Sequence, residues 1–450
     1  MAGETRSNPT QLPPLPAGWR VAAIEDLCKE VTSGGTPLRS NPEFFVGGQH
    51  DWFKTGELKD SVLFESSEKI TDEALQRSSA KLFPKDTVLM AMYGDGNTIT
   101  SLGILANEAA TNQACCAMLA DRAVCDARFL FYAMRFHRGD FIRLASGGAQ
   151  RNLSGKLIRH FALNVPAPSE QRAIAHILGT LDDKIELNRR MNETLEAMAR
   201  ALFKSWFVDF DPVRAKAEGR DPGLPQPLAD LFPDSFEESE LGEIPKGWAV
   251  QRFAETVEIV GGGTPKTSVA EYWNGGIPWF SVVDAPDGSD VWVVDTEKKI
   301  SKLGADNSST RLLPVGTTII SARGTVGKIA LVGVPMAMNQ SCYGLQGKCG
   351  EFGYHTYFAT WDLIQSLQQH AHGSVFDTIT RDTLAGVFTV TPGRALVEAF
   401  ELRVQSLMEH LRTGLLESTT LATLRDTLLP KLISGELRLK NVEESLEEAT

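Results

Sequence analysis

Apolar side chains recur at intervals of three and four residues in two long segments of the chain, about 226 positions apart. This heptad spacing is typical of helices that pair along an apolar seam, and it predicts long helices over 169–208 and 396–435. The alternative is a pair of ordinary helices that each face a core. The predicted seam consists of Leu178, Leu181, Ile185, Asn188, Asn192, Leu195 and Leu202 in the first helix, and Val404, Leu407, Leu411, Leu421 and Leu428 in the second.

The middle of this seam is polar or small in both copies. Asn188 and Asn192 interrupt the first helix, and Gly414 and Ser418 stand at the matching places of the second. Buried asparagines can fix the register of paired helices at some cost in stability. The alternative is that they face solvent.

Each long helix follows a segment that is built twice. "LPAGWRV" and "GGTP" near the start return as "IPKGWAV" and "GGTP", "TVLMAMYG" pairs with "TTIISARG", and "NQAC" pairs with "NQSC", at offsets between 226 and 230. Repeats at this distance indicate a duplicated domain. We expect an α+β fold with two similar mixed α/β domains over 1–168 and 244–395, buried strands at the "TVLMAMYG" and "TTIISARG" segments, and helices over 127–145 and 353–371.

Charge is distributed unevenly. The formal net charge is −12, but 209–243 and 436–450 together carry −10 of it. We interpret the first as an acidic, Pro-rich and irregular linker and the second as an acidic tail. The rest is nearly neutral, and 122–160 carries eight Lys/Arg against two Asp, so a nucleic-acid partner is not excluded. Six cysteines without a Cys-x-x-Cys pair, and no apolar stretch long enough to span a membrane, favour a cytoplasmic protein.

These segments together resemble the specificity subunit of a type I restriction–modification system. The resemblance rests on the two "GW…GGTP" openings, on "RGTVGKIAL" (Arg323–Leu331), on the segment from Val165 to Val213, and on "LATLRDTLLPKLISGELRL" (Leu421–Leu439). It implies that each domain is a target-recognition domain that reads one half of a bipartite site in double-stranded DNA. It also implies that the two helices form an antiparallel coiled coil.

Partners and cofactors follow from the same resemblance. Two copies of a modification subunit would dock on the helices and carry S-adenosylmethionine, and restriction subunits would use ATP and Mg²⁺. The chain itself would hold no cofactor and no metal. Polar substitutions at Leu181 and Leu407 would then abolish assembly.

Candidate DNA contacts are polar and basic residues beside the glycine turns, where the backbone can approach DNA closely. For each of them, a solvated or turn-stabilising side chain is the alternative. In the first domain they are Thr36, Arg39, Lys54, Tyr93, Asn97, Gln113, Arg151 and Asn152. In the second they are Thr264, Lys266, Ser281, Arg323, Thr325, Lys328, Gln340 and Arg381. Arg135, Arg138 and Arg143 could form a phosphate-binding helix or lie in solvent.

Catalytic motifs are sparse. The chain has no Asn/Asp-Pro-Pro-Tyr/Phe motif of an adenine methyltransferase, and "GTVGK" is too short for a phosphate-binding loop. Asp287, Glu297 and Lys299 loosely match a Mg²⁺-dependent nuclease, and His370 and His372 could bind a metal only with a third ligand. We therefore predict a non-catalytic DNA-recognition subunit; the alternatives are an autonomous endonuclease and a stand-alone DNA-binding protein.

Overall fold

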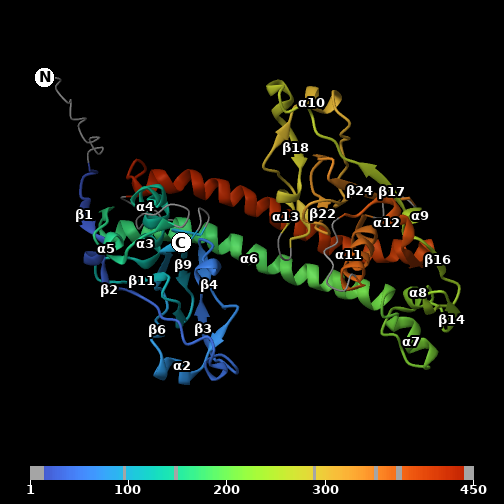
Figure 1. Cartoon of the computed structure of the whole chain (residues 1–450), viewed down its shortest axis with the longest axis horizontal. Coiled ribbons are helices and arrows are strands. Elements are labelled where there is room, and N and C mark those ends of the chain that lie inside the picture. Colours follow the sequence, from blue (N-terminus) through green and yellow to red (C-terminus); the bar gives the residue numbers. More distant parts are fainter. Residues whose placement is uncertain are drawn as a thin grey trace, which may run out of the picture. The chain divides into compact units, whose positions relative to one another are not determined.

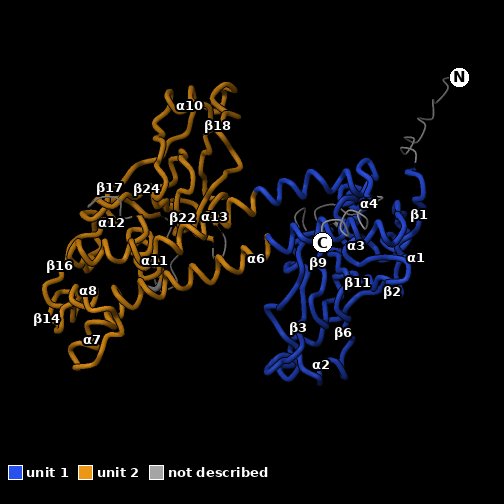
Figure 2. Tube along the Cα trace, turned by 180° about the vertical axis from the view of Figure 1, so that it is seen from behind, with its two compact units in different colours: residues 1–184, 420–450 blue, residues 185–419 orange. Residues whose placement is uncertain are grey.

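The computed structural model describes residues 15–94, 98–145, 151–286, 290–348, 353–370 and 378–439. It divides into two compact units, one of residues 1–184 with 420–450 and the other of residues 185–419 (Figure 2). The long helices are α6 (Pro168–Phe207) and α13 (Arg394–Ile433) (Figure 1), and each contributes residues to both units (Figure 2).

The first unit is built around a five-stranded sheet of order β2-β11-β7-β9-β4 and a four-stranded sheet of order β5-β3-β10-β6. The pairs β1-β13 and β12-β8 complete it. Its strands are β1 (Arg20–Ala23), β2 (Cys28–Ser33), β3 (His50–Phe53), β4 (Ser61–Leu63), β5 (Lys69–Ile70), β6 (Leu82–Phe83), β7 (Val88–Ala91), β8 (Tyr93–Gly94), β9 (Leu102–Leu105), β10 (Ala109–Thr111), β11 (Cys115–Ala120), β12 (Arg151–Asn152) and β13 (Ala162–Val165). Its short helices are α1 (Ile24–Leu27), η1 (Pro42–Phe44), η2 (Thr55–Glu57), α2 (Asp72–Arg77), α3 (Ala127–Phe136), α4 (Arg138–Leu144) and α5 (Gly155–Arg159).

The second unit repeats this plan with the five-stranded sheet β17-β24-β21-β22-β19, the three-stranded sheet β20-β18-β23 and the pair β16-β25. Its strands are β14 (Phe236–Ser239), β15 (Gly242–Pro245), β16 (Ala249–Arg252), β17 (Val257–Gly261), β18 (Trp273–Phe280), β19 (Trp292–Val293), β20 (Lys299–Ile300), β21 (Thr318–Ser321), β22 (Ile329–Val332), β23 (Ala337–Met338), β24 (Cys342–Gly347) and β25 (Phe388–Thr391). Its short helices are α7 (Asp211–Ala217), α8 (Gln226–Ala229), α9 (Phe253–Thr256), η3 (Ala270–Tyr272), η4 (Val282–Asp284), α10 (Lys302–Asp306), α11 (Gly353–His370) and α12 (Arg381–Gly386).

The central strand of each five-stranded sheet is buried on both faces, which explains its continuous apolar sequence. Val88 and Met90 of β7 pack into a core that includes α3, whereas Leu89 packs on the other face with Phe53. The predicted helix over 127–145 is divided at His137 into α3 and α4, and the predicted helix over 353–371 is α11. The predicted fold class, two similar mixed α/β domains with two long helices, is confirmed.

The two long helices pair in antiparallel order inside each unit. In the second unit the Asn188 amide donates to the Gly414 carbonyl at 3.3 Å, and the Asn192 amide donates to the Leu411 carbonyl at 3.3 Å. Residue numbers therefore rise along α6 where they fall along α13. A Cβ at Gly414 would lie 3.0 Å from Asn192 Oδ1, so the small residue of one helix accommodates the asparagine of the other.

Burial of the predicted seam residues falls into two groups. Leu178, Asn188, Asn192, Val404 and Leu411 are buried. Leu181, Ile185, Leu195, Leu202, Leu407, Leu421 and Leu428 are half-buried.

The prediction of an irregular linker over 209–243 is wrong. The segment contains α7, α8, β14 and the start of β15, and β14 pairs with β15 as a hairpin. Its acids are mostly exposed, whereas Val213 and Phe232 are buried in a cluster with Trp206 and Trp248. The prediction failed because it rested on the acidic and proline-rich composition, which does not reveal the few apolar residues that are buried.

Candidate nucleic-acid interface

The two Gly-Gly-Thr-Pro turns pass so close to a neighbouring loop that only glycine fits. A Cβ at Gly34 would lie 2.0 Å from the Thr111 carbonyl oxygen, and one at Gly262 would lie 1.8 Å from that of Asn339. The carbonyl of the next glycine accepts a hydrogen bond from a tryptophan in both copies. Trp52 Nε1 donates to the Gly35 carbonyl at 3.0 Å, as Trp279 Nε1 does to the Gly263 carbonyl at 3.0 Å. Steric fit therefore explains why both copies keep this motif.

The threonine of each turn is hydrogen-bonded to the glutamine of the "NQ" motif. The Thr36 hydroxyl donates to Gln113 Oε1, and the Thr264 hydroxyl donates to Gln340 Oε1. Both glutamines are exposed, so they are not buried structural groups. The structure thus brings these four candidates together as two equivalent Thr–Gln pairs at the surface.

Two basic candidates of the first domain share one acidic partner. Arg39 pairs with Glu68 and lies over the rings of Phe45 and Trp52, at 4.9 and 4.7 Å from their centroids. Lys54 Nζ lies 2.9 Å from Glu68 Oε1. Hydrogen bonds from Lys54 and Arg39 lower the pKa of Glu68, which is therefore held as a carboxylate.

The remaining candidates of the first domain lie on β8 and β12. Tyr93 and Asn152 are exposed and are direct partners in the β8–β12 ladder. Arg151 pairs with Gly94 through its backbone. The side chain of Arg151 and all of Asn97 lie outside the described residues.

The candidates of the second domain differ in exposure and in their contacts. Lys266, Arg323, Thr325 and Arg381 are exposed, and Lys328 is half-buried. Arg323 forms a β-bridge with Thr378, as Tyr93 pairs with Asn152 in the first domain. The Ser281 hydroxyl donates to Asp284 at 2.9 Å within the turn η4 and is therefore engaged.

Sequence comparison of the repeats missed Arg159, which contacts the edge strand β2 of the five-stranded sheet. Arg159 donates from Nε and Nη2 to the Val31 carbonyl at 3.1 and 2.7 Å. Arg381 donates from Nη2 to the Ile259 carbonyl at 3.0 Å, and Val31 and Ile259 are equivalent positions of β2 and β17. The two arginines come from opposite ends of the equivalent helices α5 and α12, so no constant offset relates them.

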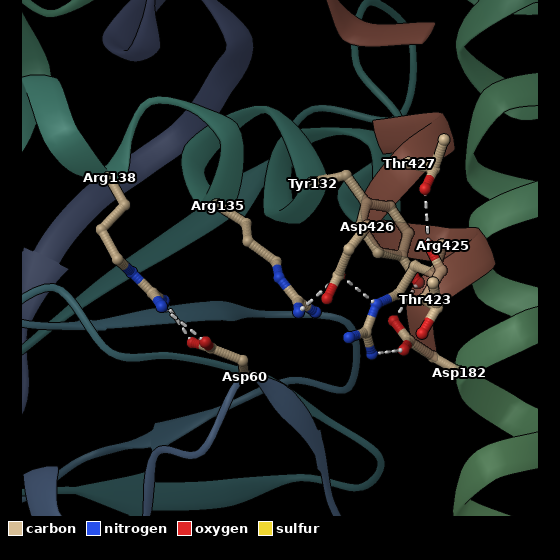
Figure 3. A network of polar contacts seen from close by, with 9 residues as sticks. All are labelled: Asp60, Tyr132, Arg135, Arg138, Asp182, Thr423, Arg425, Asp426 and Thr427. Carbon is tan, nitrogen blue, oxygen red and sulfur yellow. Dashed lines mark hydrogen bonds and ion pairs between the residues drawn. The ribbon is translucent and has the colours of Figure 1, made fainter. Parts of the chain in front are cut away.

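The basic stretch over 122–160 does not form a free phosphate-binding helix. Arg138 forms an ion pair with Asp60, and Arg135 Nη2 lies 3.3 Å from Asp426 Oδ1 (Figure 3). The pKa of Asp60 falls because the hydrogen bond and charge of Arg138 outweigh the burial that raises it. Arg143 is exposed but pairs with Asp140. Both earlier interpretations are therefore corrected for Arg135 and Arg138, which neither extend into solvent nor are free to bind phosphate.

The described residues form neither the nuclease site nor the metal site that the sequence left as alternatives. Glu297 donates its backbone N–H to Asp284, and Lys299 Nζ pairs with Asp295 at 2.9 Å. Asp287, His372 and the side chain of His370 lie outside the described residues. No group of three His, Cys, Asp or Glu side chains in the described part could hold a metal ion. Within the same ranges, every helix is too short or too polar to cross a membrane.

Comparison with known proteins gives one consistent result. Residues 16–197 and 245–387 match the family model described as the type I restriction modification DNA specificity domain. The chain is 26% identical over 448 residues to the type I restriction enzyme MjaIX specificity subunit of Methanocaldococcus jannaschii, covering 98% of each chain. It is 29% identical over 326 residues to the HindI specificity subunit of Haemophilus influenzae, covering 62% of this chain and 70% of that one.

A solved structure shares the fold. The type I restriction–modification S subunit from M. genitalium matches with a TM-score of 0.58 at 16% sequence identity, covering 92% of this chain and 96% of that one. The duplicated turns, the paired helices and the family match agree with one another. The chain belongs to the family of type I restriction–modification specificity subunits.

Proposed function

We propose that this protein is the non-catalytic DNA-recognition subunit of a type I restriction–modification complex, and that each α/β domain reads one half of a bipartite site. One observation carries the proposal: the two domains share one backbone frame but differ in the side chains that they present at equivalent places. Tyr93 and Arg323, for example, are exposed at matching positions next to equivalent strands. A common frame with different side chains suits two half-sites of different sequence.

The paired helices are the proposed platform for two copies of the S-adenosylmethionine-dependent modification subunit and, through them, for the restriction subunits that use ATP and Mg²⁺. An exposed apolar stripe on α6 supports this role. Leu187, Met191 and Met198 are 53%, 47% and 53% exposed. Their spacing of four and seven residues places them on one side of the helix. Exposed apolar stripes of this kind mark contacts with other proteins.

Methylation mapping tests the recognition role. The chain would be co-expressed with its modification subunit in a host that lacks DNA methylation, and N6-methyladenine would be mapped by long-read sequencing. We expect one split motif with a fixed spacer, methylated only when both subunits are present. Methylation by the modification subunit alone, or a motif that is not split, would contradict the proposal.

Co-purification tests the platform. Met191→Lys places a charge in the apolar stripe and should abolish recovery of the modification subunit with the chain. Ala197→Lys is the matched control, because it places the same side chain at an exposed position of α6 that lies about 100° around the helix from Met198. This control should leave recovery unchanged. Equal recovery with both variants would show that the stripe is not the docking surface.

A further inference from the structure

An arginine caps the same backbone carbonyl at the sheet edge of both domains. Val31 and Ile259 occupy equivalent places on the edge strands β2 and β17, opposite Met118 of β11 and Leu345 of β24. Arg159 and Arg381 reach these carbonyls from opposite ends of α5 and α12. The same guanidinium position is thus built in two different ways, which a shared ancestral residue cannot explain.

The surroundings of the two guanidinium groups differ. Beside Arg159 lies a hollow of about 240 Å³ that is also lined by Tyr93, Asn152, Ser33 and Cys116. The position of Cys116 on β11 corresponds to Tyr343 on β24, because Cys116 lies opposite Ser33 and Tyr343 opposite Gly261 in the equivalent ladders.

The second domain therefore presents a different surface. The centroid of the Tyr343 ring lies 6.0 Å from the Arg381 guanidinium. Arg323 and Thr378 stand where the first domain has Tyr93 and Asn152. Among the described side chains, the first domain thus offers a hollow lined by Arg159, Tyr93 and Asn152, and the second offers Arg381 beside the Tyr343 ring, with Arg323 in the place of Tyr93.

The Thr–Gln pairs provide the contrast. Thr36 with Gln113 and Thr264 with Gln340 have the same side chains and the same hydrogen bond in both domains. Identical groups with identical neighbours cannot distinguish two different half-sites, whereas a shared guanidinium can do so when the side chains around it differ. The edge beside Arg159 and Arg381 is such a position, because the guanidinium is shared while Tyr93 and Asn152 of the first domain are replaced by Arg323 and Thr378 in the second.

We infer that this edge is the base-reading element of each domain, and that Arg159, with Asn152, hydrogen-bonds to base edges of the first half-site. Two hydrogen bonds to Val31 fix the plane of the Arg159 guanidinium, and its remaining N–H groups form a fork that suits the O6 and N7 acceptors of guanine. The Asn152 amide suits the N6 and N7 edge of adenine. The inference rests on the proposed function, because it names the residues through which that function selects its sequence.

The test uses the complete complex. Methylation would be mapped for the wild type, Arg159→Gln, Arg381→Gln and the control Arg122→Gln, which alters an exposed arginine beyond the opposite end of β11. We expect Arg159→Gln to lose about 5- to 150-fold discrimination at one or more positions of the first half-site and to leave the second half-site unchanged. Arg381→Gln should do the reverse, and Arg122→Gln should change neither.

Other outcomes are distinct. An unchanged motif in both Arg159→Gln and Arg381→Gln would overturn the inference and leave the proposed function standing. A uniform loss of affinity, with a salt dependence of binding lower by about one charge, would place Arg159 on a phosphate and overturn base reading. A general loss of both half-sites together with a lower melting temperature would show a purely structural role. A wild-type complex without a split motif would overturn the proposed function and this inference with it.

Discussion

Asp182 of α6 links the first domain to both long helices within its unit. Its carboxylate accepts the Tyr132 hydroxyl of α3 at 2.7 Å and Arg425 Nη1 of α13 at 2.6 Å (Figure 3). Arg425 also donates to Asp426 at 2.8 Å, and Asp426 in turn accepts from Arg135. The side chains of Arg425 and Asp182 are only 12% and 18% exposed, so water compensates little of their charge. We therefore expect Asp182→Asn to weaken the packing of both α13 and α3 against α6.

The magnitude follows from what each change leaves unpaired. Breaking a buried ion pair costs about 3–5 kcal/mol. Because Arg425 keeps Asp426 as a partner, we expect about 2–3 kcal/mol for Asp182→Asn. Tyr132→Phe removes one neutral hydroxyl and leaves the ion pair intact, so its cost should be about 1 kcal/mol. Most of the destabilisation in Asp182→Asn should therefore come from the lost charge of Asp182 and less from its hydrogen bond with Tyr132.

Hydrogen exchange measured by mass spectrometry reports this locally. If α3 exchanges through opening of its attachment, a loss of 2–3 kcal/mol speeds exchange over 127–136 by about 30- to 150-fold. The peptide over 353–368, in the second unit, serves as the internal control and should not change. Exchange in Asp182→Asn that is no faster than in Tyr132→Phe would refute the view that the ion pair between α6 and α13 also stabilises the attachment of α3.

Two further predictions concern the second unit. Burial raises the pKa of Glu401 to about 7, although the backbone N–H groups of Tyr354 and His355 lower it. Because an unfolded glutamate titrates near about 4.3, the folded chain binds more protons between these values, and its stability should fall as pH rises from about 4.5 to 7. In urea unfolding, Glu401→Gln should remove this fall in stability. Burial lowers the pKa of His355 to about 4, so this residue makes stability rise with pH, but it is present in both proteins. An unchanged pH profile in Glu401→Gln would therefore contradict the assignment to Glu401. In Gly262→Ala the added Cβ would lie 1.8 Å from a backbone oxygen, so thermal unfolding should show a loss of more than about 3 kcal/mol in stability. Gly276→Ala, whose Cβ would meet open space, is the control and should be nearly neutral. Equal melting temperatures of the two variants would contradict the steric argument.

Periodicity and repetition were sufficient to predict the architecture. The heptad spacing is a local property of each long helix, and the offset between repeats follows from a shared frame, so both can be read from the sequence. The apolar anchors Val213 and Phe232 were missed because their burial depends on Trp206 and Trp248, which come from outside the segment. Composition describes the exposed majority of such a segment and misses the few residues that fold it.

The candidate DNA-contact residues were predictable only in part, for a related reason. Alignment of the repeats finds residues that keep their offset, such as Gln113 and Gln340. It cannot find Arg159, because the guanidinium is delivered from the other end of α5 and only the three-dimensional frame makes it equivalent to Arg381. Net charge was a poor guide to phosphate binding for the same reason, since Asp60 and Asp426, distant in sequence, neutralise Arg138 and Arg135.

One further pair of equivalent positions differs in charge between the two domains. The backbone N–H of Trp52 donates to the Ser66 hydroxyl, which donates to the Glu68 carbonyl, and Trp279, Thr296 and Lys298 repeat the same chain of bonds, at 2.9 and 2.6 Å in both domains. The residue that ends this chain is thus an acid in the first domain and a base in the second. Glu68 occupies Arg39 and Lys54, whereas Lys298 is exposed and adds a positive charge at the corresponding place. Since the backbone is the same, this backbone arrangement does not require a particular charge at the position. They would favour different contacts with a polyanion, and the second domain would bind DNA phosphate more strongly at this position than the first.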